Sequence, residues 1–379
     1  KAEETLKRLG VSIPTDKVMS GLSVGQQQMI EICKALMVDA KVIIMDEPTA
    51  ALTQSETEVL FEVMQSLRKK GVSIVYISHR MEEIFELCDR ISVLRDGTYI
   101  GTKKIPETNM NEIVKMMIGR EIGERYPKRD CAIGSEVFRV EDLTKEGVFH
   151  DVNFSVKAGE VLGVSGLMGA GRTEIMQAIF GNLSYDRGSI FIGGKQAVIK
   201  NPLQAIEHGI GFITEDRKTE GLLLEESIEK NVSLTNLGRI TGKGRVVISR
   251  EKEKGLVTKA IEELHIRCFG PGHECVNLSG GNQQKVVFAK WIYTEPRILI
   301  LDEPTRGVDI GAKKEIYSII NQLAEKGVAI IMVSSELPEV LGMSDRIMVV
   351  REGMVRGIIG QDEADQEKIM TLATGGTLS

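Results

Sequence analysis

The residues with the clearest chemical potential are two acidic pairs, Asp46-Glu47 and Asp302-Glu303, each of which ends an apolar run and is followed by Pro-Thr. An aspartate in this position can hold Mg²⁺ directly or through water, and the next glutamate can orient or deprotonate an attacking water. A single pair could be a solvated acidic turn at a strand end. Two identical Asp-Glu-Pro-Thr quartets disfavour that alternative.

A glycine-rich stretch, GLMGAGRT at Gly166–Thr173, predicts a phosphate-binding loop. It fits G-x-x-x-x-G-K-[ST] except that Arg172 stands where lysine is expected. Backbone N–H groups would wrap the phosphates, the following helix would add a favourable field, and the Thr173 hydroxyl would reach Mg²⁺. Arginine keeps the charge but is a bulkier, planar fork. Such a loop can also be a plain turn, but its place between a strand and a helix favours nucleotide binding.

A Ser-Gly-Gly turn at 279–281 opens a predicted helix ahead of Asp302, and Ser23-Val24-Gly25 precedes Asp46 in the same way. Such a turn offers backbone donors and a hydroxyl to an anion, although alone it is only a helix cap. Its recurrence ahead of both acidic pairs gives it significance. His79 follows another apolar strand, from which a histidine can donate to a γ-phosphate.

The chain contains a long internal repeat. Leu22 aligns with Leu278, an offset of 278 − 22 = 256 residues, and Asp89 aligns with Asp345 at the same offset. Solenoid units are only about 20–50 residues long, so two copies of a whole domain are expected. We expect 1–119 to be the C-terminal part of a first copy, 120–135 a linker and 136–379 a complete second copy. The first copy's phosphate loop would then lie upstream of Lys1, in a chain that lacks its N-terminal part.

The segments that carry these residues predict an α/β fold. The run at 41–45 has the composition of a strand buried on both faces of a parallel sheet, and a predicted helix at 55–70 separates it from a second such strand at 72–77. Strand, helix and strand in this order indicate a parallel sheet. The second copy adds predicted antiparallel strands at 137–143 and 152–156, and helices and loops between 218 and 276.

Composition sets limits on function. The 379 residues are 42% hydrophobic and 27% charged, as in ordinary soluble proteins, and a net charge of −6 disfavours nucleic acid as the main partner. Five scattered cysteines without a C-x-x-C pair indicate reduced thiols. No apolar run approaches the roughly 18–20 residues that span a bilayer, so a membrane association would require a partner.

Together these motifs resemble the ATP-binding-cassette family. Gly166–Thr173 looks like Walker A, 278–282 and 22–26 look like the signature, and 298–303 and 42–47 look like Walker B. The resemblance covers nearly the whole chain and is greatest to the twin-cassette ATP-binding subunits of bacterial ribose/galactose-type carbohydrate importers. It implies a P-loop NTPase fold in two tandem copies, the first incomplete, each with a parallel core sheet and antiparallel β and helical subdomains.

The family implies that cassettes pair head to tail, so that each ATP lies between Walker A and B of one copy and the signature of the other. The implied catalytic residues are Glu47, His79 and Glu303. The implied Mg²⁺ ligands are Thr173, Asp46 and Asp302. The implied ATP-binding residues are Gly166, Met168, Gly169, Ala170, Gly171, Arg172, Thr173, Glu215, Ser23, Gly25, Gln26, Ser279, Gly280, Gly281, Asn282, Asp309 and Ser335.

Four departures from the family pattern fall on the nucleotide site of the second copy: Arg172 for lysine, Ser335 for the switch histidine, Glu215 for the Q-loop glutamine and Val24 for a signature glycine. We therefore expect this site to bind ATP and hydrolyse it poorly. The site of the first copy departs mainly at Thr53, which replaces the D-loop aspartate. We expect ATP hydrolysis mainly there, and little or none by the present chain alone.

The resemblance also implies partners: integral-membrane permease subunits and, indirectly, a periplasmic or extracellular sugar-binding protein, with the protein on the cytoplasmic face of a bacterial membrane. Two alternatives stay open. A soluble twin-cassette ATPase acting on ribosomes or nucleic acid would carry a long basic linker or a coiled coil, whereas 120–135 is short and of mixed charge. A regulatory nucleotide-binding module would lack catalysis. Nothing in the sequence identifies the sugar.

Overall fold

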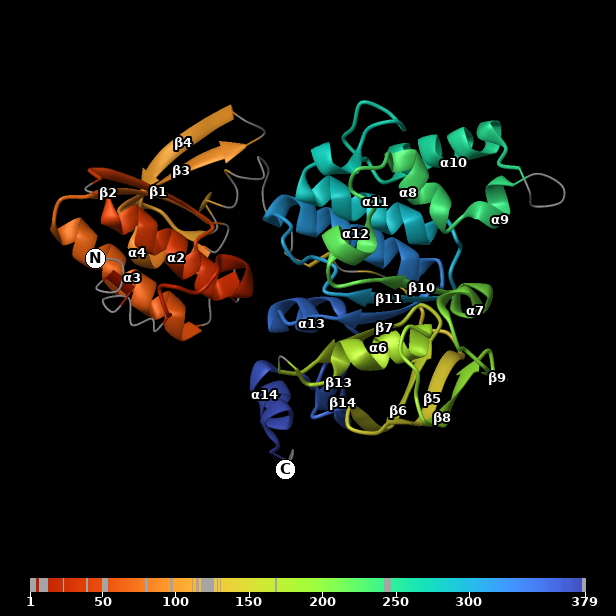
Figure 1. Ribbon diagram of the computed structural model, residues 1–379. Helices are drawn as coiled ribbons and strands as arrows, with labels where there is room; N and C mark the ends of the chain where they lie inside the picture. The colour runs from red at the N-terminus through yellow and green to blue at the C-terminus, as the bar shows by residue number, and fades with distance from the viewer. Residues whose placement is uncertain are drawn as a thin grey trace. The chain divides into compact units, whose positions relative to one another are not determined.

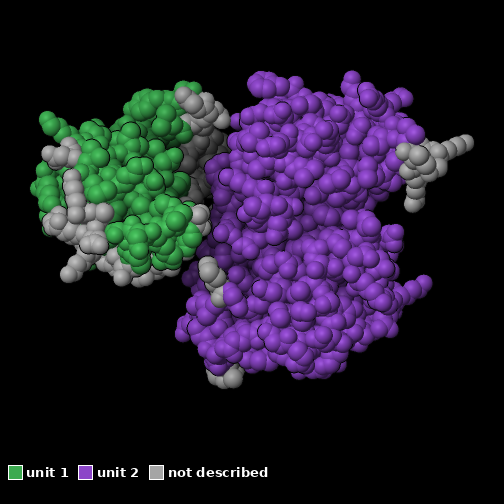
Figure 2. Space-filling model, viewed as in Figure 1, with its two compact units in different colours: residues 1–122 green, residues 123–379 purple. Residues whose placement is uncertain are grey.

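The computed structural model divides the chain into two compact units, unit 1 at 1–122 and unit 2 at 123–379, and Figure 2 shows them in different colours. The structure describes all residues except 1–4, 7–12, 23, 39, 50–53, 79–80, 96–97, 111, 114–115, 117–125, 128, 130, 168, 242–246 and 377–379. The boundary between the units falls inside the segment predicted to be a linker.

The core of unit 2 is a six-stranded sheet with the order β10-β11-β12-β7-β13-β14 (Figure 1). The first five strands are parallel, and β14 pairs antiparallel with β13 at one edge. Every residue of β7, β10, β11 and β12 is buried, as their continuous apolar sequences predict. The strands are β7 (Val161–Ser165), β10 (Ile210–Ile213), β11 (Ile298–Asp302), β12 (Ala329–Val333), β13 (Arg346–Arg351) and β14 (Met354–Gly360).

Helices cover this sheet on both faces. In Figure 1, α11 and α12 lie on one side of it, and α6 lies on the side that faces a second, antiparallel sheet. The helices outside the segment between β10 and β11 are α6 (Arg172–Phe180), α7 (Pro202–Glu207), α12 (Ile310–Glu325), α13 (Leu337–Met343) and α14 (Gln366–Thr374). Because consecutive parallel strands are joined through helices, the carboxyl ends of β7, β11 and β12 meet at one edge.

The antiparallel sheet has the strand order β6-β5-β8-β9. Its strands are β5 (Glu136–Lys145), β6 (Phe149–Lys157), β8 (Arg187–Ile192) and β9 (Lys195–Ala197). The first two confirm the predicted antiparallel strands and extend them at both ends. Buried side chains of both sheets, such as Phe138 and Leu162, belong to one apolar cluster. This sheet therefore shares the core of unit 2.

The segment between β10 and β11 is helical, as predicted. Its described residues form no named strand, only isolated bridges such as Ser227 with Glu274. Its elements are η3 (Arg217–Gly221), a single π-helical turn, α8 (Ile228–Leu234), α9 (Leu237–Ile240), α10 (Arg250–Glu263), η4 (Cys275–Asn277) and α11 (Gly280–Ile292).

Unit 1 contains two small sheets: β1 and β2 are parallel, and β3 and β4 are antiparallel. Met29 and Leu60, from the helices α2 and α3, pack with Ile43 and Met45 in the core of this unit. The elements are η1 (Met19–Gly21), α2 (Val24–Met37), β1 (Val42–Asp46), α3 (Gln54–Lys69), β2 (Ser73–Ile77), α4 (Met81–Leu87), β3 (Arg90–Arg95), β4 (Thr98–Lys104) and η2 (Ile105–Glu107).

The predicted burial of both strands of the parallel pair in unit 1 is wrong. The run at 41–45 was predicted to be buried on both faces, but β1 alternates between exposed and buried residues, and Ile44 is 69% exposed. The physical reason is that the described residues of β1 pair only with β2, and the unit's buried apolar side chains lie on one face of the pair. The helix predicted at 55–70 and the strand at 72–77 are confirmed with slightly different ends. The predicted burial of the second strand is wrong as well, since Val75 and Ile77 of β2 are 49% and 46% exposed.

Candidate nucleotide site

The glycine-rich loop joins β7 to α6 in unit 2. Gly166, Gly169 and Gly171 have φ of +156°, +76° and +93°, which favour glycine. A Cβ on Gly166 would lie 2.3 Å from the Val350 carbonyl oxygen, whereas a Cβ on Gly169 would meet nothing within 4 Å. The loop is therefore packed on one side and open on the other, and α6 begins directly after it. Its backbone donors suit a phosphate on the open side.

Asp302, the last residue of β11, is fully buried, and among the described residues no group donates a hydrogen bond of normal geometry to either of its carboxylate oxygens. Burial raises its pKa to about 6, while the neighbouring Thr173 hydroxyl lowers it. A buried, unpaired carboxylate is unfavourable unless a cation compensates it. The described residues hold no group of three or more acidic, His or Cys side chains that is arranged to bind a metal ion. Mg²⁺ bound with nucleotide needs only one or two carboxylates, so Asp302 and Thr173 fit that ion.

Glu303 leaves the strand in an uncommon backbone conformation. Its φ is +49°, and its N–H donates to the Val333 carbonyl at 2.9 Å. Glu47 in unit 1 repeats this geometry, with φ of +46° and a 2.9 Å bond to the Ile77 carbonyl. The two Asp-Glu-Pro-Thr quartets thus share one backbone shape.

Arg172 lies against the ends of two core strands. Its Nη1 donates to the Ser334 carbonyl at 3.0 Å, and its Nη2 is 3.9 Å from Glu303 Oε1. The Ser335 hydroxyl donates to Glu303 Oε2 at 3.1 Å. Burial raises the pKa of Glu303 to about 7, and the charge of Arg172 lowers it. The structure therefore brings together Arg172, Glu303 and Ser335, three residues that the sequence had placed in one site.

Glu215, which follows β10, forms an ion pair with Arg306. Arg217 in η3 donates from Nη1 to the Arg306 carbonyl at 2.6 Å and from Nη2 to the Gly307 carbonyl at 2.9 Å. The same loop leads to Asp309, which caps α12 by accepting from the Ala312 N–H at 3.0 Å. Sequence reasoning identified Glu215 and Asp309 but missed the two arginines, because no motif spacing connects residues about 90 positions apart.

The Ser-Gly-Gly turn of unit 2 is built as a tight helix start. Ser279 precedes α11, and its hydroxyl accepts from Asn282 Nδ2 at 2.9 Å. A Cβ on Gly280 would lie 2.9 Å from Arg217 Nη2, and one on Gly281 would lie 2.6 Å from the Ala312 Cβ. A side chain at Gly281 would therefore clash with Ala312, whereas one at Gly280 would have to displace the end of the Arg217 side chain. In unit 1, Gly25 and Gln26 lie in the first turn of α2, while Ser23, Thr53 and His79 lie outside the described residues, as does Met168 of unit 2.

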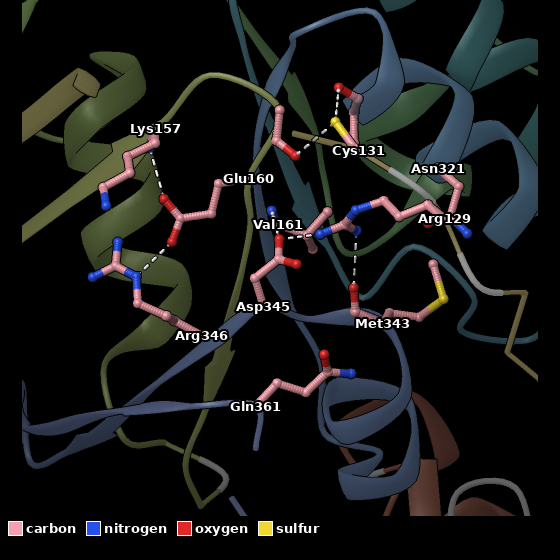
Figure 3. Close-up of polar contacts among 12 residues, drawn as sticks. Arg129, Cys131, Lys157, Glu160, Val161, Asn321, Met343, Asp345, Arg346 and Gln361 are labelled. Atoms are coloured by element: carbon pink, nitrogen blue, oxygen red, sulfur yellow. Dashed lines mark hydrogen bonds and ion pairs between the residues drawn. The ribbon is translucent and has the colours of Figure 1, made fainter. Parts of the chain in front are cut away.

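Polar contacts hold the start of β7, the strand that leads into the glycine-rich loop (Figure 3). Asp345 accepts from the Val161 N–H at 2.8 Å and from the Arg129 guanidinium, which also donates to the Met343 carbonyl. Asn321 donates to the Pro127 carbonyl at 2.6 Å. The described part of the segment predicted to be a linker therefore packs against unit 2 through specific polar contacts.

These features define an ATP-binding cassette. A profile described as ABC transporter matches residues 1–50 and 149–306. The chain belongs to this family, which confirms the resemblance and the α/β fold class inferred from the motifs.

Several relatives are similar over nearly the whole chain. It is 59% identical over 375 residues to the ribose import ATP-binding protein RbsA of Bacillus licheniformis, a match that covers 99% of this chain and 76% of that protein. The ribose import ATP-binding protein RbsA of Bacillus subtilis is 58% identical over 375 residues, with the same coverage of 99% and 76%.

Solved structures are similar in fold. An ATP-binding cassette of an ABC transporter in its ADP conformation gives a TM-score of 0.53 at 23% identity, covering 63% of this chain and 95% of that one. For cbiO1 of Clostridium perfringens, part of an ABC transporter complex, the TM-score is 0.52 at 23% identity, and coverage is 62% and 93%. Within the described part of the chain, no helix is long and apolar enough to cross a membrane.

Proposed function

We propose that this protein is the ATP-binding subunit of a bacterial sugar importer and couples ATP binding and hydrolysis to transport through a membrane permease. The observation that carries the proposal is the 59% identity over 99% of the chain to a ribose import ATP-binding protein. Ribose is accordingly the first sugar to test. Neither the net charge of −6 nor the similarity to ribose import proteins favours the alternative partner, a ribosome or nucleic acid.

The partners follow from this class. The chain would dock on the cytoplasmic face of integral-membrane permease subunits, which receive the sugar from a periplasmic or extracellular binding protein. Two cassettes would pair head to tail around two ATP molecules. One site would combine Asp46, Glu47 and His79 with the Ser-Gly-Gly turn at 279–281. The other would combine Gly166–Thr173, Asp302 and Glu303 with the turn of the first copy at 23–25.

At the second-copy site, Mg²⁺ would be held by Thr173 and Asp302, where it would neutralise charge on the ATP phosphates. The open side of the glycine-rich loop would receive those phosphates through its N–H groups. Glu303, whose pKa of about 7 is raised by burial, would orient the attacking water. Arg172 would keep a positive charge beside the phosphates, and Ser335 would hold Glu303 through its 3.1 Å hydrogen bond.

Three observations support slow hydrolysis at this second-copy site. The Arg172 guanidinium lies 3.9 Å from Glu303, where its charge opposes proton uptake by that carboxylate. Ser335 lacks the imidazole that a histidine would direct at the transferring phosphoryl group. Glu215 is an anion engaged with Arg306 rather than a neutral glutamine. Loss of one positioned donor typically lowers the rate by about 10²–10³, so ATP would bind here and turn over mainly at Glu47.

The test compares Glu47→Gln with Glu303→Gln in the transporter assembled from the full-length ATP-binding subunit, the permease and a ribose-binding protein. Ribose-stimulated ATPase activity should fall about 100-fold or more for Glu47→Gln and less than about threefold for Glu303→Gln. Equal losses for the two variants would refute the asymmetry. No stimulation by ribose, with stimulation by another sugar, would refute the ribose assignment but not the importer.

A further inference from the structure

Each unit buries a glutamate that none of the motifs includes. Glu83 in α4 is 7% exposed, and Glu339 in α13 is 1% exposed. They are related by the repeat, since 339 − 83 = 256. A buried carboxylate is retained in a fold only where hydrogen bonds or charges compensate its lost hydration.

In unit 1, three hydroxyl groups converge on one oxygen of Glu83. Its Oε2 accepts from Thr49 Oγ1 at 3.0 Å, from Tyr76 at 2.6 Å and from Ser78 Oγ at 3.1 Å. Thr49 follows β1, whereas Tyr76 and Ser78 belong to the end of β2 and the residue after it. Glu83 therefore ties together the ends of the two parallel strands of this unit. Hydrogen bonds to a carboxylate are about twice as strong as neutral ones.

The two segments that Glu83 joins by hydrogen bonds lead to the residues proposed to be reactive in the first-copy site. Thr49 stands two residues after Glu47, and Ser78 immediately precedes His79. The Glu47 N–H also donates to the Ile77 carbonyl at 2.9 Å, so the backbones of the two segments are in direct contact. A displacement of Glu83 would therefore shift Thr49 and Ser78, and with them the two segments that lead to the reactive residues.

Unit 2 builds the same arrangement with a different tyrosine. The Thr305 hydroxyl donates to Glu339 Oε1 at 2.7 Å. Met332 takes the place of Tyr76, but Tyr317 in α12 takes the place of Phe61. Burial and then the charge of Glu339 raise the pKa of Tyr317, as burial and Glu83 raise that of Tyr76. Each copy thus has a tyrosine whose pKa its buried carboxylate raises, on the strand in one and on the helix in the other.

We propose that Glu83 is a positioning residue for ATP hydrolysis, which holds the segment of Glu47 and the segment of His79 in their reactive arrangement. It does not touch the nucleotide and acts through the hydroxyls of Thr49 and Ser78. The proposal rests on the proposed function, in which Glu47 serves the site that hydrolyses ATP. It deepens that function by assigning the element that sets the geometry of the site.

The test is Glu83→Gln in the assembled transporter, with Glu339→Gln as the matched control. Each variant removes a buried carboxylate that accepts a hydrogen bond from a threonine, Thr49 in one copy and Thr305 at the same repeat position in the other. A misplacement of about 1 Å can lower a rate about 10²-fold. We expect kcat to fall about 10–100-fold for Glu83→Gln, with KM for ATP and ATP-binding stoichiometry changed less than about threefold, and kcat for Glu339→Gln to stay within about threefold.

A second pair of variants separates positioning from loss of fold. Thr49→Val removes one hydrogen-bond donor and keeps the carboxylate, and it should lower kcat about 3–10-fold. In the double variant with Glu83→Gln, the fall in kcat should be smaller than the product of the two single effects. Thr305→Val should leave kcat within about threefold. The positioning role of Glu83 would be refuted if Glu83→Gln or Thr49→Val lowered kcat no more than its control. If Glu47→Gln abolished turnover in the same assay, the assignment of the hydrolytic site to Glu47 would stand. Equal loss for Glu47→Gln and Glu303→Gln would instead refute the asymmetry between the two sites on which this proposal rests.

Discussion

Strand β1 of unit 1 and strand β11 of unit 2 are the same segment of the repeat, yet they lie in different surroundings. Both are apolar runs ending in Asp-Glu-Pro-Thr, and both place the glutamate at a positive φ. Ile300 in β11 is fully buried, whereas its counterpart Ile44 in β1 is 69% exposed. β11 lies between β10 and β12, while β1 pairs with β2 in a sheet of two described strands.

This difference shows which features follow from the sequence of the segment alone and which depend on the strands packed beside it. The turn after the strand, with Glu47 or Glu303 at positive φ and its N–H on the adjacent strand, forms in both units. The second face of the strand is buried in β11 but not in β1, because its burial depends on residues that are distant in sequence. Chemistry carried by the turn can therefore be compared between the copies, and the first two predictions below change a residue in one copy with its counterpart as the control.

The largest expected difference concerns the switch position. His79→Ala should lower the ATPase activity of the assembled transporter about 10²–10³-fold, because it removes a donor to the transferring phosphoryl group. Ser335→Ala should change it less than about threefold, since the serine in the structure donates to Glu303. Steady-state phosphate release measures both. A comparable loss for the two alanine variants would show that both sites hydrolyse ATP.

The next difference concerns the strand itself. Ile300→Ala should lower the free energy of unfolding of unit 2 by about 2–5 kcal/mol, because a fully buried side chain leaves a cavity. Ile44→Ala should change that of unit 1 by less than about 0.5 kcal/mol, as expected for an exposed position. Chemical denaturation with probes in each unit measures both values. A cost above about 2 kcal/mol for Ile44→Ala would mean that its face is covered in solution.

A smaller effect concerns the pH dependence of the second-copy site. Burial raises the pKa of Glu303 from 4.5 to about 7, so the folded, nucleotide-free protein loses stability as pH rises through this window and the carboxylate ionises. Glu303→Gln removes that loss and should stabilise unit 2 by about 1–3 kcal/mol at pH 8, with the gain vanishing near pH 4.5. Thermal unfolding at both pH values measures it.

Asp302→Asn provides the control for this pH effect. Burial raises the pKa of Asp302 from 3.8 to about 6, so its gain should appear over a lower pH window than that of Glu303→Gln. A stabilisation by Glu303→Gln that is equal at pH 4.5 and pH 8 would show that ionisation is not its cause.

The smallest effect concerns the signature helix. In α11, the buried Lys285 donates to the His265 carbonyl at 2.9 Å and lies 2.5 Å from Glu315 of α12, whereas its counterpart in α2 is Met29. Lys285→Met should destabilise unit 2 by about 1 kcal/mol, since one carbonyl loses its donor while Glu315 remains hydrated. Exposed Lys34→Met in α2 is the control, with no measurable change in unfolding. A loss above about 3 kcal/mol would mean that the ion pair is essential to this helix.

Much of the fold and the site could be predicted because the motifs are contiguous. The loop at Gly166–Thr173 and the Asp302-Glu303 pair lie within single segments whose glycines and strand ends dictate their shape. The two-sided burial of β1 was wrong because it required neighbouring strands that the run at 41–45 does not specify. Arg217, Arg306 and the buried glutamates were missed because their contacts join distant segments.

The exchange of tyrosines between the copies restricts how each copy can change. In unit 1 the hydroxyl that reaches the buried carboxylate comes from Tyr76, and in unit 2 the equivalent tyrosine is Tyr317. A change of Tyr76 to methionine alone would remove its 2.6 Å hydrogen bond to Glu83, and a change of Phe61 to tyrosine alone would add a hydroxyl at the repeat position that Tyr317 occupies in unit 2. The two substitutions are expected to be epistatic, tolerated together and harmful singly, so the duplicated halves can exchange this tyrosine only by a paired substitution.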